Sequence, residues 1–478
     1  MTRFFFYSLT IIFILEIQFF SVGCANMVPP QGGLRDTIPP SLVHASPPDS
    51  SHNFQDSRIT LTFSEFVTVE NTRENLIISP LPKNDPIVEY HLRTVTVRLK
   101  DTLQPNTTYT LDFGKAIRDV NEGNIDKNFT YLFSTGPTFD SLSLAGKVVV
   151  AETGRPDSTL IVMLHVHGDD SAVVNEKPRY ITRLDSSGNF TFRNLPAGRF
   201  YIYALDDQGG GHRYYSEKQL FAFRDSAVEA KAENTPITLY AFGEKSAPTS
   251  TVRSTSAVPG QISSKQKLGG GQEKRLKLQT NLTGNEQDLL TNLVINSELP
   301  LKNLDTSLIH FSRDSSFVPV SDYHLSVDSS KKKLTLQYSW KENNPYHLII
   351  EKNFATDSLG RALLKTDTIN FKTKKLSDYG SLRIRFINFD PSINPVLQFV
   401  QSDQVVKSIP LKSADVNESL FRPGDYQLRI LHDRNKNGKW DTGEFFGKHL
   451  QPEVVKPVTS RPRLTVKPDW ENDFDIVL

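Results

Sequence analysis

The sequence contains a single cysteine, Cys24, so no disulfide can form within the chain. It also lacks an excess of charge, because 55 lysine and arginine residues face 54 aspartate and glutamate residues, for a formal net charge of +1. Such a balance removes the bulk electrostatic attraction by which proteins bind nucleic acid or acidic surfaces. We therefore expect no nucleic-acid partner, and a fold stabilised by hydrophobic cores.

Long helical patterns and catalytic motifs are missing as well. Beyond the first two dozen residues, no long stretch shows apolar residues at helical spacing, and Val, Ile, Thr, Phe and Tyr dominate the apolar runs. Together with 28 prolines and 26 glycines, this composition favours strands and turns. The sequence has no G-x-S-x-G motif and no phosphate-binding glycine loop. A length of 478 residues allows three or four domains, and we expect an all-β protein that is not an enzyme.

The first 23 residues have the layout of a secretory signal, since Arg3 precedes an apolar run that ends in small residues. Glu16 and Gln18 interrupt the run, which is short for a bilayer span. Residues 21–24, Ser-Val-Gly-Cys, resemble the lipobox of bacterial lipoproteins, in which the cysteine becomes the acylated first residue. The resemblance implies a signal peptide at 1–23 and an N-terminal lipid on Cys24. Plain secretion and an uncleaved anchor helix are the alternatives.

A tether rich in proline and glycine follows at 24–40, and the first of four strand-rich modules spans 41–137. Arg58–Phe63 and Thr94–Leu99 alternate polar and apolar residues, which predicts half-buried strands. Short strands of this kind, separated by turn residues at regular spacing, predict an antiparallel β-sandwich.

The first module resembles the bacterial Ig-like domain of the SbsA/Big_5 type. The residues that carry the resemblance are Pro39-Pro40, Pro47-Pro48-Asp49, Ile59–Glu65, Leu103–Tyr109, Asp119–Gly123 and Phe133–Thr135. They match a Pro-Pro entry, a Phe-Ser-Glu strand, a Leu-x-Pro-x-Thr-x-Tyr corner and a Phe-x-Thr exit. The resemblance implies an Ig-like sandwich, a fold that serves many roles.

The second module, at 142–243, contains an Asp-x-x-Gly-x-Phe turn at Asp185–Phe190, in which Gly188 is free to adopt a positive φ. A Leu-Pro-Ala-Gly turn at 195–198 then leads into the strand Phe200–Leu205. This order resembles the carboxypeptidase-regulatory-like or Cna-B/transthyretin-like sandwich, a module that usually acts as a spacer or stalk.

Residues 245–272 are rich in Ser, Thr, Pro, Gly, Gln and Lys, which predicts a flexible linker. The earlier pattern then recurs. Asn344–Ile350 occupies the place of Thr107–Phe113, which indicates a degenerate second Ig-like domain at 275–375. At 379–478 a second Cna-B-like sandwich is expected, because Arg422–Tyr426 matches Pro196–Phe200, and at the same offset Asp433 matches Asp207.

One motif in the last module is specific. Asp433, Asn435, Asn437, Gly438 and Glu444 fit the calcium-loop pattern D-x-[DN]-x-[DN]-G-x5-E. Calcium takes six to eight oxygen ligands, and we expect them from the side chains of Asp433, Asn435, Asn437, Asp441 and Glu444 and from the carbonyl of Lys439. The flanking segments read as strand and turn instead of helix, so the loop is not an EF-hand. The alternative is a turn that Asn, Asp and Gly build through hydrogen bonds to the backbone.

Two further patterns are weaker. His165 and His167 share one face of a predicted strand, but no third zinc ligand follows at a recognisable spacing, so a solvated strand face is expected there. Tyr214 and Tyr215 form an aromatic pair that could stack on a sugar if exposed, with burial as the alternative.

Over the whole chain, the sequence resembles the Ig-like-domain outer-membrane lipoproteins of Bacteroidota. The resemblance rests on the Gly-Gly-x-x-Asp-x-x-Pro-Pro pattern at Gln31–Pro40. It implies a non-enzymatic envelope scaffold, bound to the membrane through its lipid and to an envelope protein partner. The residues after Cys24 are not acidic, which favours the periplasmic face of the outer membrane over the cell surface. A surface adhesin or glycan-binding lipoprotein is the alternative.

Overall fold

The computed structural model describes residues 35–127, 129–207, 209–232, 235–244 and 275–478. The predicted signal peptide, Cys24, most of the tether and the predicted linker lie outside the described residues. Regular structure is almost entirely strand, apart from short turns of helix at α2 (Thr72–Asn75), α3 (Ala172–Asn175), η1 (Thr306–Leu308), η2 (Leu376–Asp378) and η3 (Pro391–Ile393). None of the helices within the described ranges is long and apolar enough to cross a membrane. The expected fold class, tandem antiparallel β-sandwiches, is confirmed.

Module 1 packs a four-stranded sheet, β1-β2-β6-β5, against a three-stranded sheet, β4-β7-β9, and the short pair β3-β8 lies beside them. In β2, alternate residues Ile59, Leu61 and Phe63 are buried, as the sequence pattern predicts. The strands are β1 (Leu42–Ser46), β2 (Arg58–Phe63), β3 (Val67–Val69), β4 (Ile77–Ser79), β5 (Ile87–His91), β6 (Thr94–Arg98), β7 (Thr108–Asp112), β8 (Ile117–Asp119) and β9 (Thr130–Ser134).

Module 2 joins a three-stranded sheet, β13-β10-β17, to a larger sheet, β12-β11-β14-β15, in which β16 also pairs with β14. The strands β10 and β17 run parallel, and all other pairs are antiparallel. Gly188 has a φ of 81°, as its turn requires. The strands are β10 (Leu142–Val150), β11 (Leu160–His165), β12 (Tyr180–Arg183), β13 (Asn189–Leu195), β14 (Arg199–Asp206), β15 (Phe221–Phe223), β16 (Val228–Glu229) and β17 (Ile237–Ala241).

Module 3 repeats the strand order of module 1. Its sheets are β18-β20-β25-β24 and β19-β28-β26-β22-β23, with the short pair β21-β27. The strands are β18 (Leu278–Thr280), β19 (Glu286–Gln287), β20 (Leu293–Ser297), β21 (Leu301–Lys302), β22 (Ile309–Arg313), β23 (Val318–Pro319), β24 (His324–Val327), β25 (Lys333–Gln337), β26 (Pro345–Ile350), β27 (Thr356–Asp357) and β28 (Asp367–Thr373).

Module 4 repeats the strand order of module 2, including the parallel pair, here β29 with β36. Its sheets are β32-β29-β36 and β31-β30-β33-β34, in which β35 also pairs with β33. The strands are β29 (Gly380–Ile387), β30 (Pro395–Gln401), β31 (Gln404–Pro410), β32 (Asp415–Phe421), β33 (Gly424–His432), β34 (Val454–Pro457), β35 (Leu464–Val466) and β36 (Glu471–Val477).

The repetition extends to single hydrogen bonds. The hydroxyl of Tyr109 accepts the backbone N–H of Gln104 at 2.9 Å, and in module 3 the hydroxyl of Tyr346 accepts that of Lys341 at 3.4 Å. Each tyrosine thereby secures the corner before its own strand, β7 or β26. The same side-chain device at equivalent places agrees with the repeated strand order of modules 1 and 3.

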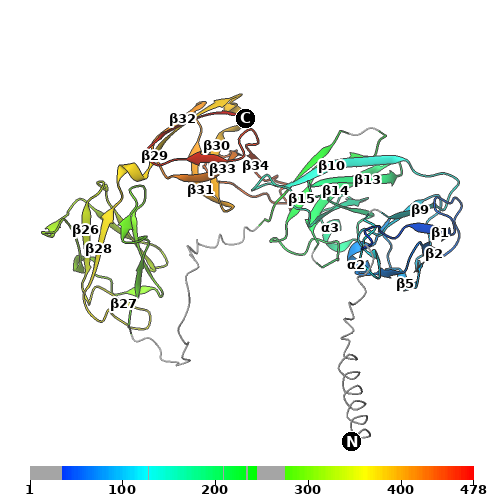
Figure 1. The fold of residues 1–478 in the computed structure, drawn as a ribbon, viewed down its shortest axis with the longest axis horizontal. Coiled ribbons are helices and arrows are strands. Elements are labelled where there is room, and N and C mark those ends of the chain that lie inside the picture. Colours follow the sequence, from blue (N-terminus) through cyan, green and yellow to red (C-terminus); the bar gives the residue numbers. More distant parts are fainter. Residues whose placement is uncertain (1–34, 128, 208, 233–234, 245–274) are drawn as a thin grey trace, which may run out of the picture.

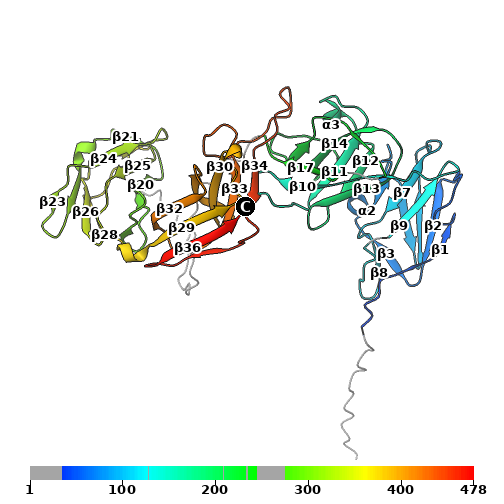
Figure 2. The same cartoon turned by 90° about the horizontal axis from the view of Figure 1, so that it is seen from above.

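The four modules alternate along the sequence but not in space. Each has its own hydrophobic core, yet the spatial order along the molecule is module 1, module 2, module 4, module 3 (Figures 1 and 2). Modules 3 and 4 are joined by hydrogen bonds from Leu289 N–H to the Tyr379 hydroxyl and from Arg422 to Asp288, both 2.8 Å long. The two modules of the second type therefore meet at the centre of the molecule.

Candidate functional site

The predicted calcium loop begins where β33 ends, and its first residue is a turn former. Asp433 is buried, and its carboxylate accepts the backbone N–H of Asn437 at 3.2 Å and that of Gly438 at 2.7 Å. Gly438 has a φ of 76°, which a residue with a Cβ adopts at a cost. Asp433 thus organises the loop through backbone hydrogen bonds.

Four of the five predicted side-chain ligands lie together. The side-chain amides of Asn435 and Asn437 each donate to Oδ2 of Asp441 at 2.7 Å, and Oδ1 of Asn437 accepts the N–H of Lys439 at 2.7 Å. With Asp433, these residues form one polar cluster that combines turn hydrogen bonds to the backbone with side-chain hydrogen bonds to Asp441. An oxygen-rich cluster of this kind matches the ligand chemistry of calcium, provided that the amide groups rotate their oxygens toward the ion.

Glu444 does not join that cluster through any hydrogen bond recorded among the described residues. Its carboxylate instead pairs with Lys448 at 2.7 Å, and its backbone pairs with that of Leu450. Within the part of the chain that the structure describes, no three His, Cys, Asp or Glu side chains come together to hold a metal ion. The predicted ligand Glu444 is thus engaged elsewhere in this structure.

Sequence reasoning missed Glu453, which closes the loop from the other side. Glu453 is buried, and its two carboxylate oxygens accept the N–H groups of Arg434 at 2.6 Å and Asp441 at 3.1 Å. Its carbonyl also accepts the indole N–H of Trp440 at 2.7 Å. The motif ends nine residues earlier, so no local pattern pointed to this side chain.

The equivalent loop of module 2 shows the same turn without the cluster. Asp207 accepts the backbone N–H of His212 at 3.0 Å, and His212, with a φ of 53°, stands at the offset of Gly438. The turn therefore forms in both copies, and among the described residues only the copy in module 4 surrounds it with amide and carboxylate oxygens.

After the loop, the chain of module 4 inserts Phe445 into module 2. Phe445 is 1% exposed, and its ring lies 5.0 Å from Phe221, 4.9 Å from Phe223 and 6.0 Å from Tyr203. These rings face outward from β14 and β15, away from the core of module 2, and form a second hydrophobic cluster with Phe445. The N–H of Phe445 donates to Glu244 at 3.0 Å.

Module 2 contributes to the same junction through the turn that follows β10. The N–H of Val455 in β34 donates to the carbonyl of Ala151 at 2.9 Å. Arg155 forms an ion pair with Asp403 at 2.5 Å. A Cβ at Gly154 would lie 2.4 Å from the carbonyl oxygen of Val455, so only glycine permits this approach. The two modules are interlocked by backbone, charge and aromatic contacts.

The expectation for His165 and His167 needs correction. His165 is not on a solvated face: it is buried against Tyr203, and burial lowers its pKa to about 4, while His167 is exposed and pairs with Glu176 at 3.1 Å. For the aromatic pair, whose exposure the sequence left open, Tyr214 is buried on Phe221 and Tyr215 is exposed. Side chains alternate between the two faces only within a strand. Because β11 ends at His165, the alternation does not extend to His167.

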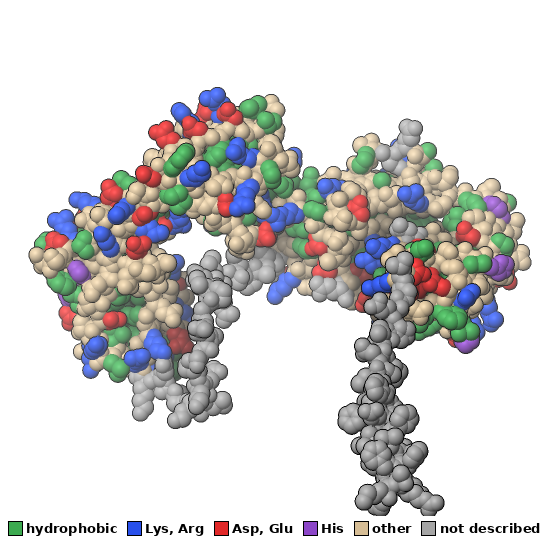
Figure 3. Space-filling view, viewed as in Figure 1, with side chains coloured by type: hydrophobic (Ala, Val, Ile, Leu, Met, Phe, Trp, Pro, Cys, Tyr) green, Lys and Arg blue, Asp and Glu red, His purple; other side chains and the backbone are tan. Residues whose placement is uncertain are grey.

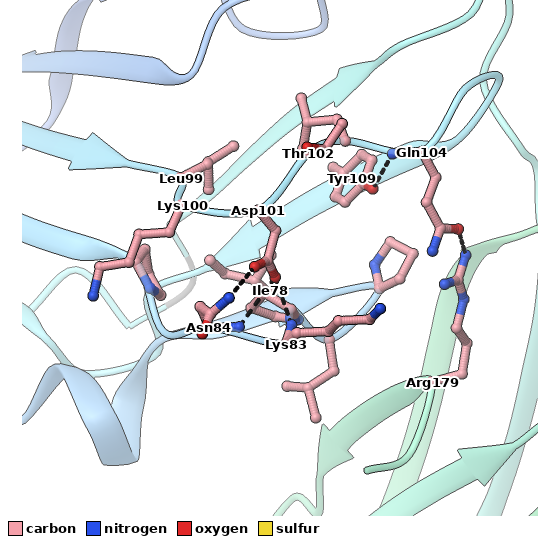
Figure 4. Close-up of a pocket in the computed structure, with 15 residues that line it drawn as sticks. Ile78, Lys83, Asn84, Leu99, Lys100, Asp101, Thr102, Gln104, Tyr109 and Arg179 are labelled. Atoms are coloured by element: carbon pink, nitrogen blue, oxygen red, sulfur yellow. Dashed lines mark hydrogen bonds between the residues drawn. The ribbon is translucent and has the colours of Figure 1, made fainter. Parts of the chain in front are cut away.

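A cavity of about 510 Å³ lies where module 1 meets module 2 (Figure 4). Lys83, Lys100 and Arg179 line it, and Asp101 is the carboxylate among its lining residues. Burial alone would raise the pKa of Asp101, but hydrogen bonds from the backbone and side chain of Asn84 and from the backbone of Lys83 outweigh burial and lower it. Asp101 is therefore ionised and holds the loop in place.

Comparison with known proteins supports the sandwich assignment of module 1. The bacterial Ig-like domain family model matches residues 36–135, as the sequence motifs predict. No curated protein matches the chain.

Three solved structures illustrate the range of similar chains. The Bacillus anthracis TIE protein is 11% identical, with 94% of this chain and 76% of that chain covered and a TM-score of 0.16. The N-terminal part of the bacterial S-layer protein SbsC is 16% identical, covering 43% and 44%, with a TM-score of 0.15. An L,D-transpeptidase from Mycobacterium smegmatis is 12% identical, covering 36% and 78%, with a TM-score of 0.16. At these scores the similarity carries no functional argument.

Proposed function

We propose that this protein is a non-enzymatic lipoprotein of the cell envelope, anchored through Cys24 at the periplasmic face of the outer membrane, where it acts as a scaffold that positions a protein partner. The observation that carries the proposal is the interlocked junction of modules 2 and 4. Insertion of Phe445 into a cluster on module 2 makes a continuous body of modules that have separate cores. A continuous body of this kind suits a scaffold that holds a protein partner at a fixed distance from the membrane anchor.

The arrangement also places the membrane-anchored end of the protein opposite the end that is available to a partner. Module 1 receives the chain from Cys24, and module 3 lies at the opposite end of the molecule (Figure 1). Titratable groups such as Asp101 and Asp433 accept backbone hydrogen bonds and shape turns. Their roles support a structural protein, and module 3 is the part most available to a partner distant from the membrane.

Replacement of Cys24 tests the anchor. In a Cys24→Ser variant, the acyl chains have no attachment point, so we expect the protein to move from the membrane fraction to the soluble periplasm and to lose incorporation of labelled palmitate. A Val22→Ala variant is the matched control, because it changes the same segment but keeps the cysteine, and it should stay in the membrane fraction with its label. Membrane retention of Cys24→Ser without palmitate would contradict a lipid anchor and favour an uncleaved helix.

Protease treatment of intact cells tests the face of the membrane. A periplasmic scaffold stays intact until the outer membrane is permeabilised, whereas a surface adhesin is cleaved at once. Native purification from solubilised envelopes then identifies the partner, and we expect its recovery to depend on module 3.

We also propose that the loop Asp433–Asp441 binds calcium, with Asp433, Asn435, Asn437, Asp441 and the carbonyl of Lys439 as the ligands within reach of one another. Because modules 2 and 4 share a cluster, calcium should raise the melting temperature of both together. At a concentration 100 times Kd, the expected stabilisation is about 2.7 kcal/mol.

A calorimetric scan with calcium and with chelator measures this effect. An Asp441→Ala variant should lose the response, while Asp207→Ala in the equivalent loop of module 2 should keep it. An unchanged scan for the unaltered chain would leave the loop as a turn only.

A further inference from the structure

One end of module 1 exposes four apolar side chains. They are Ile38, Phe66, Leu92 and Val120, with exposed fractions of 70%, 47%, 58% and 53%. Ile38 lies in the segment before β1, and each of the other three lies in a different loop. No local sequence pattern therefore predicts that they form a group. Scattered exposed apolar residues are normal, but a contiguous set marks an interaction surface.

Hydrogen bonds between their loops show that the four residues are neighbours. The N–H of Val120 donates to the carbonyl of Phe66 at 3.1 Å, and the N–H of Val67 donates to the carbonyl of Leu92 at 2.9 Å. The side chain of Asn124 reaches the carbonyl of Ile38 at 3.3 Å. We name these four residues, Ile38, Phe66, Leu92 and Val120, the tether-end patch.

Leu92 has an unusual backbone for its type. It is the first residue of the two-residue turn between β5 and β6, and its φ is +54°. Glycine, asparagine or aspartate is the ordinary choice for such a position, because a side chain is strained there. Here an apolar side chain occupies the tip of the hairpin and is held outward in water.

The chain from Cys24 enters the fold at this end. Arg35 donates to the carbonyl of Glu122, and Asn124 also donates to the carbonyl of Asp36, so the first described residues lie against the 120–124 loop. Ten residues, 25–34, separate Cys24 from Arg35. At full extension this stretch reaches about 36–40 Å, so an acylated Cys24 keeps this end of module 1 close to the bilayer.

The views of the molecule agree with this placement. Figure 2 shows β3 and β8 at the side of module 1 where the first described residues lie. Figure 3 shows apolar, acidic and basic side chains close together on module 1 near that point. Val67 and Asp119, which begin β3 and end β8, adjoin Phe66 and Val120 of the patch.

We propose that the tether-end patch inserts into the headgroup region of the membrane and orients the rest of the molecule away from it. The proposal rests on the lipid anchor of the proposed function, which brings the patch to the bilayer. Its occupant is a lipid surface of low net charge, because Asp36, Glu65 and Glu122 flank the patch and are only partly balanced by Arg35 and by Arg93, whose guanidinium lies 5.5 Å from the centre of the Phe66 ring. Burial and the neighbouring carboxylates of Asp119, Asp36 and Glu122 raise the pKa of Glu65, although Arg93 lowers it.

A single labelled thiol tests the contact, because the only native cysteine carries the lipid. Leu92→Cys in the full lipidated chain is coupled to an environment-sensitive fluorophore, and the protein is reconstituted into vesicles of phosphatidylcholine and phosphatidylethanolamine. We expect emission to shift to the blue and nitroxide-labelled lipid to quench it. Leu359→Cys in module 3, 67% exposed, is the matched control and should show neither effect.

Further variants separate the patch from the anchor. Val120→Cys gives a second labelling position should the Leu92 hairpin fail to form. Phe66→Ser with Ile38→Ser should abolish the shift while the protein still co-sediments with vesicles, and added phosphatidylglycerol should weaken the shift. If the protein co-sediments with vesicles but the fluorophore emits as it does in water at both patch positions, the proposal that the patch inserts is wrong and the proposed lipid anchor stands. Failure of the lipid-modified chain to co-sediment overturns both proposals.

Discussion

Replacing Phe445 with alanine should separate the two halves of the molecule. The ring is enclosed by Phe221, Phe223 and Tyr203 of module 2, and loss of a buried phenylalanine typically costs about 3–5 kcal/mol. Other contacts between modules 2 and 4, such as the hydrogen bonds from Thr442 to the carbonyl of Gly243 at 2.6 Å and from Gln451 to that of Phe223 at 3.2 Å, are polar. Phe445 is the fully buried ring that module 4 contributes to the shared apolar cluster, so we expect the junction to open without it. Small-angle scattering of the full chain should then show a broader distribution of distances, and calorimetry should resolve the transitions of modules 2 and 4.

The neighbouring residue is the matched control. Phe446 is 40% exposed and contacts only one described ring, that of Tyr214 at 5.7 Å, outside its own pair with Phe445. Phe446→Ala should cost less than about 1 kcal/mol and leave the scattering curve unchanged. Equal effects of the two substitutions, or an unchanged junction in Phe445→Ala, would show that the interlock does not depend on this ring.

Removal of Asp119 should destabilise module 1 by about 3 kcal/mol, because three backbone groups lose a charged acceptor in a buried turn. Asp119 is 2% exposed and accepts the N–H groups of Glu122, Gly123 and Asn124 at 2.6, 2.9 and 2.7 Å. Denaturant unfolding of Asp119→Ala measures the loss. The exposed Asp56→Ala in the same module should change stability by less than about 0.5 kcal/mol.

Module 3 repeats the device, which permits a test in the same chain. Asp357 accepts the N–H groups of Leu359 and Arg361 and pairs with the Arg361 guanidinium at 2.6 Å. Asp357→Ala should lower the transition of module 3 and spare module 1, whereas Asp119→Ala should do the reverse. Loss of both modules in either variant would contradict the separate cores.

The same carboxylates make stability depend on pH. Burial alone would raise the pKa of Asp119, but hydrogen bonds from the backbone of residues 121–124 outweigh burial and lower it below 3.8. A lowered pKa in the folded state stabilises the protein above about pH 4, and this contribution disappears as the pH falls through the folded-state pKa. The pH midpoint of acid unfolding of module 1 should therefore change in Asp119→Asn, because this substitution removes the titrating group.

Local patterns in the sequence predicted individual elements well. The strand expected at Arg58–Phe63 has those bounds, and the expected strand Phe200–Leu205 lies within β14. Asp207 and Asp433, which the repeat offset matched with each other, accept backbone hydrogen bonds at the same offset in their modules. These features succeed because alternation, turn chemistry and repetition are properties of neighbouring residues.

By itself, then, the sequence determined the β-sandwich class of the fold and predicted the repetition of a two-module unit. Only the tertiary structure decided that module 2 contacts module 4, with module 3 at the far end of the molecule. It also decided that Phe445 fills the junction, that Glu453 closes the neighbouring loop and that His165 is buried. These outcomes depend on which surfaces meet after each sandwich has formed. Residues that are distant along the chain bury one another there, and no local periodicity records such contacts.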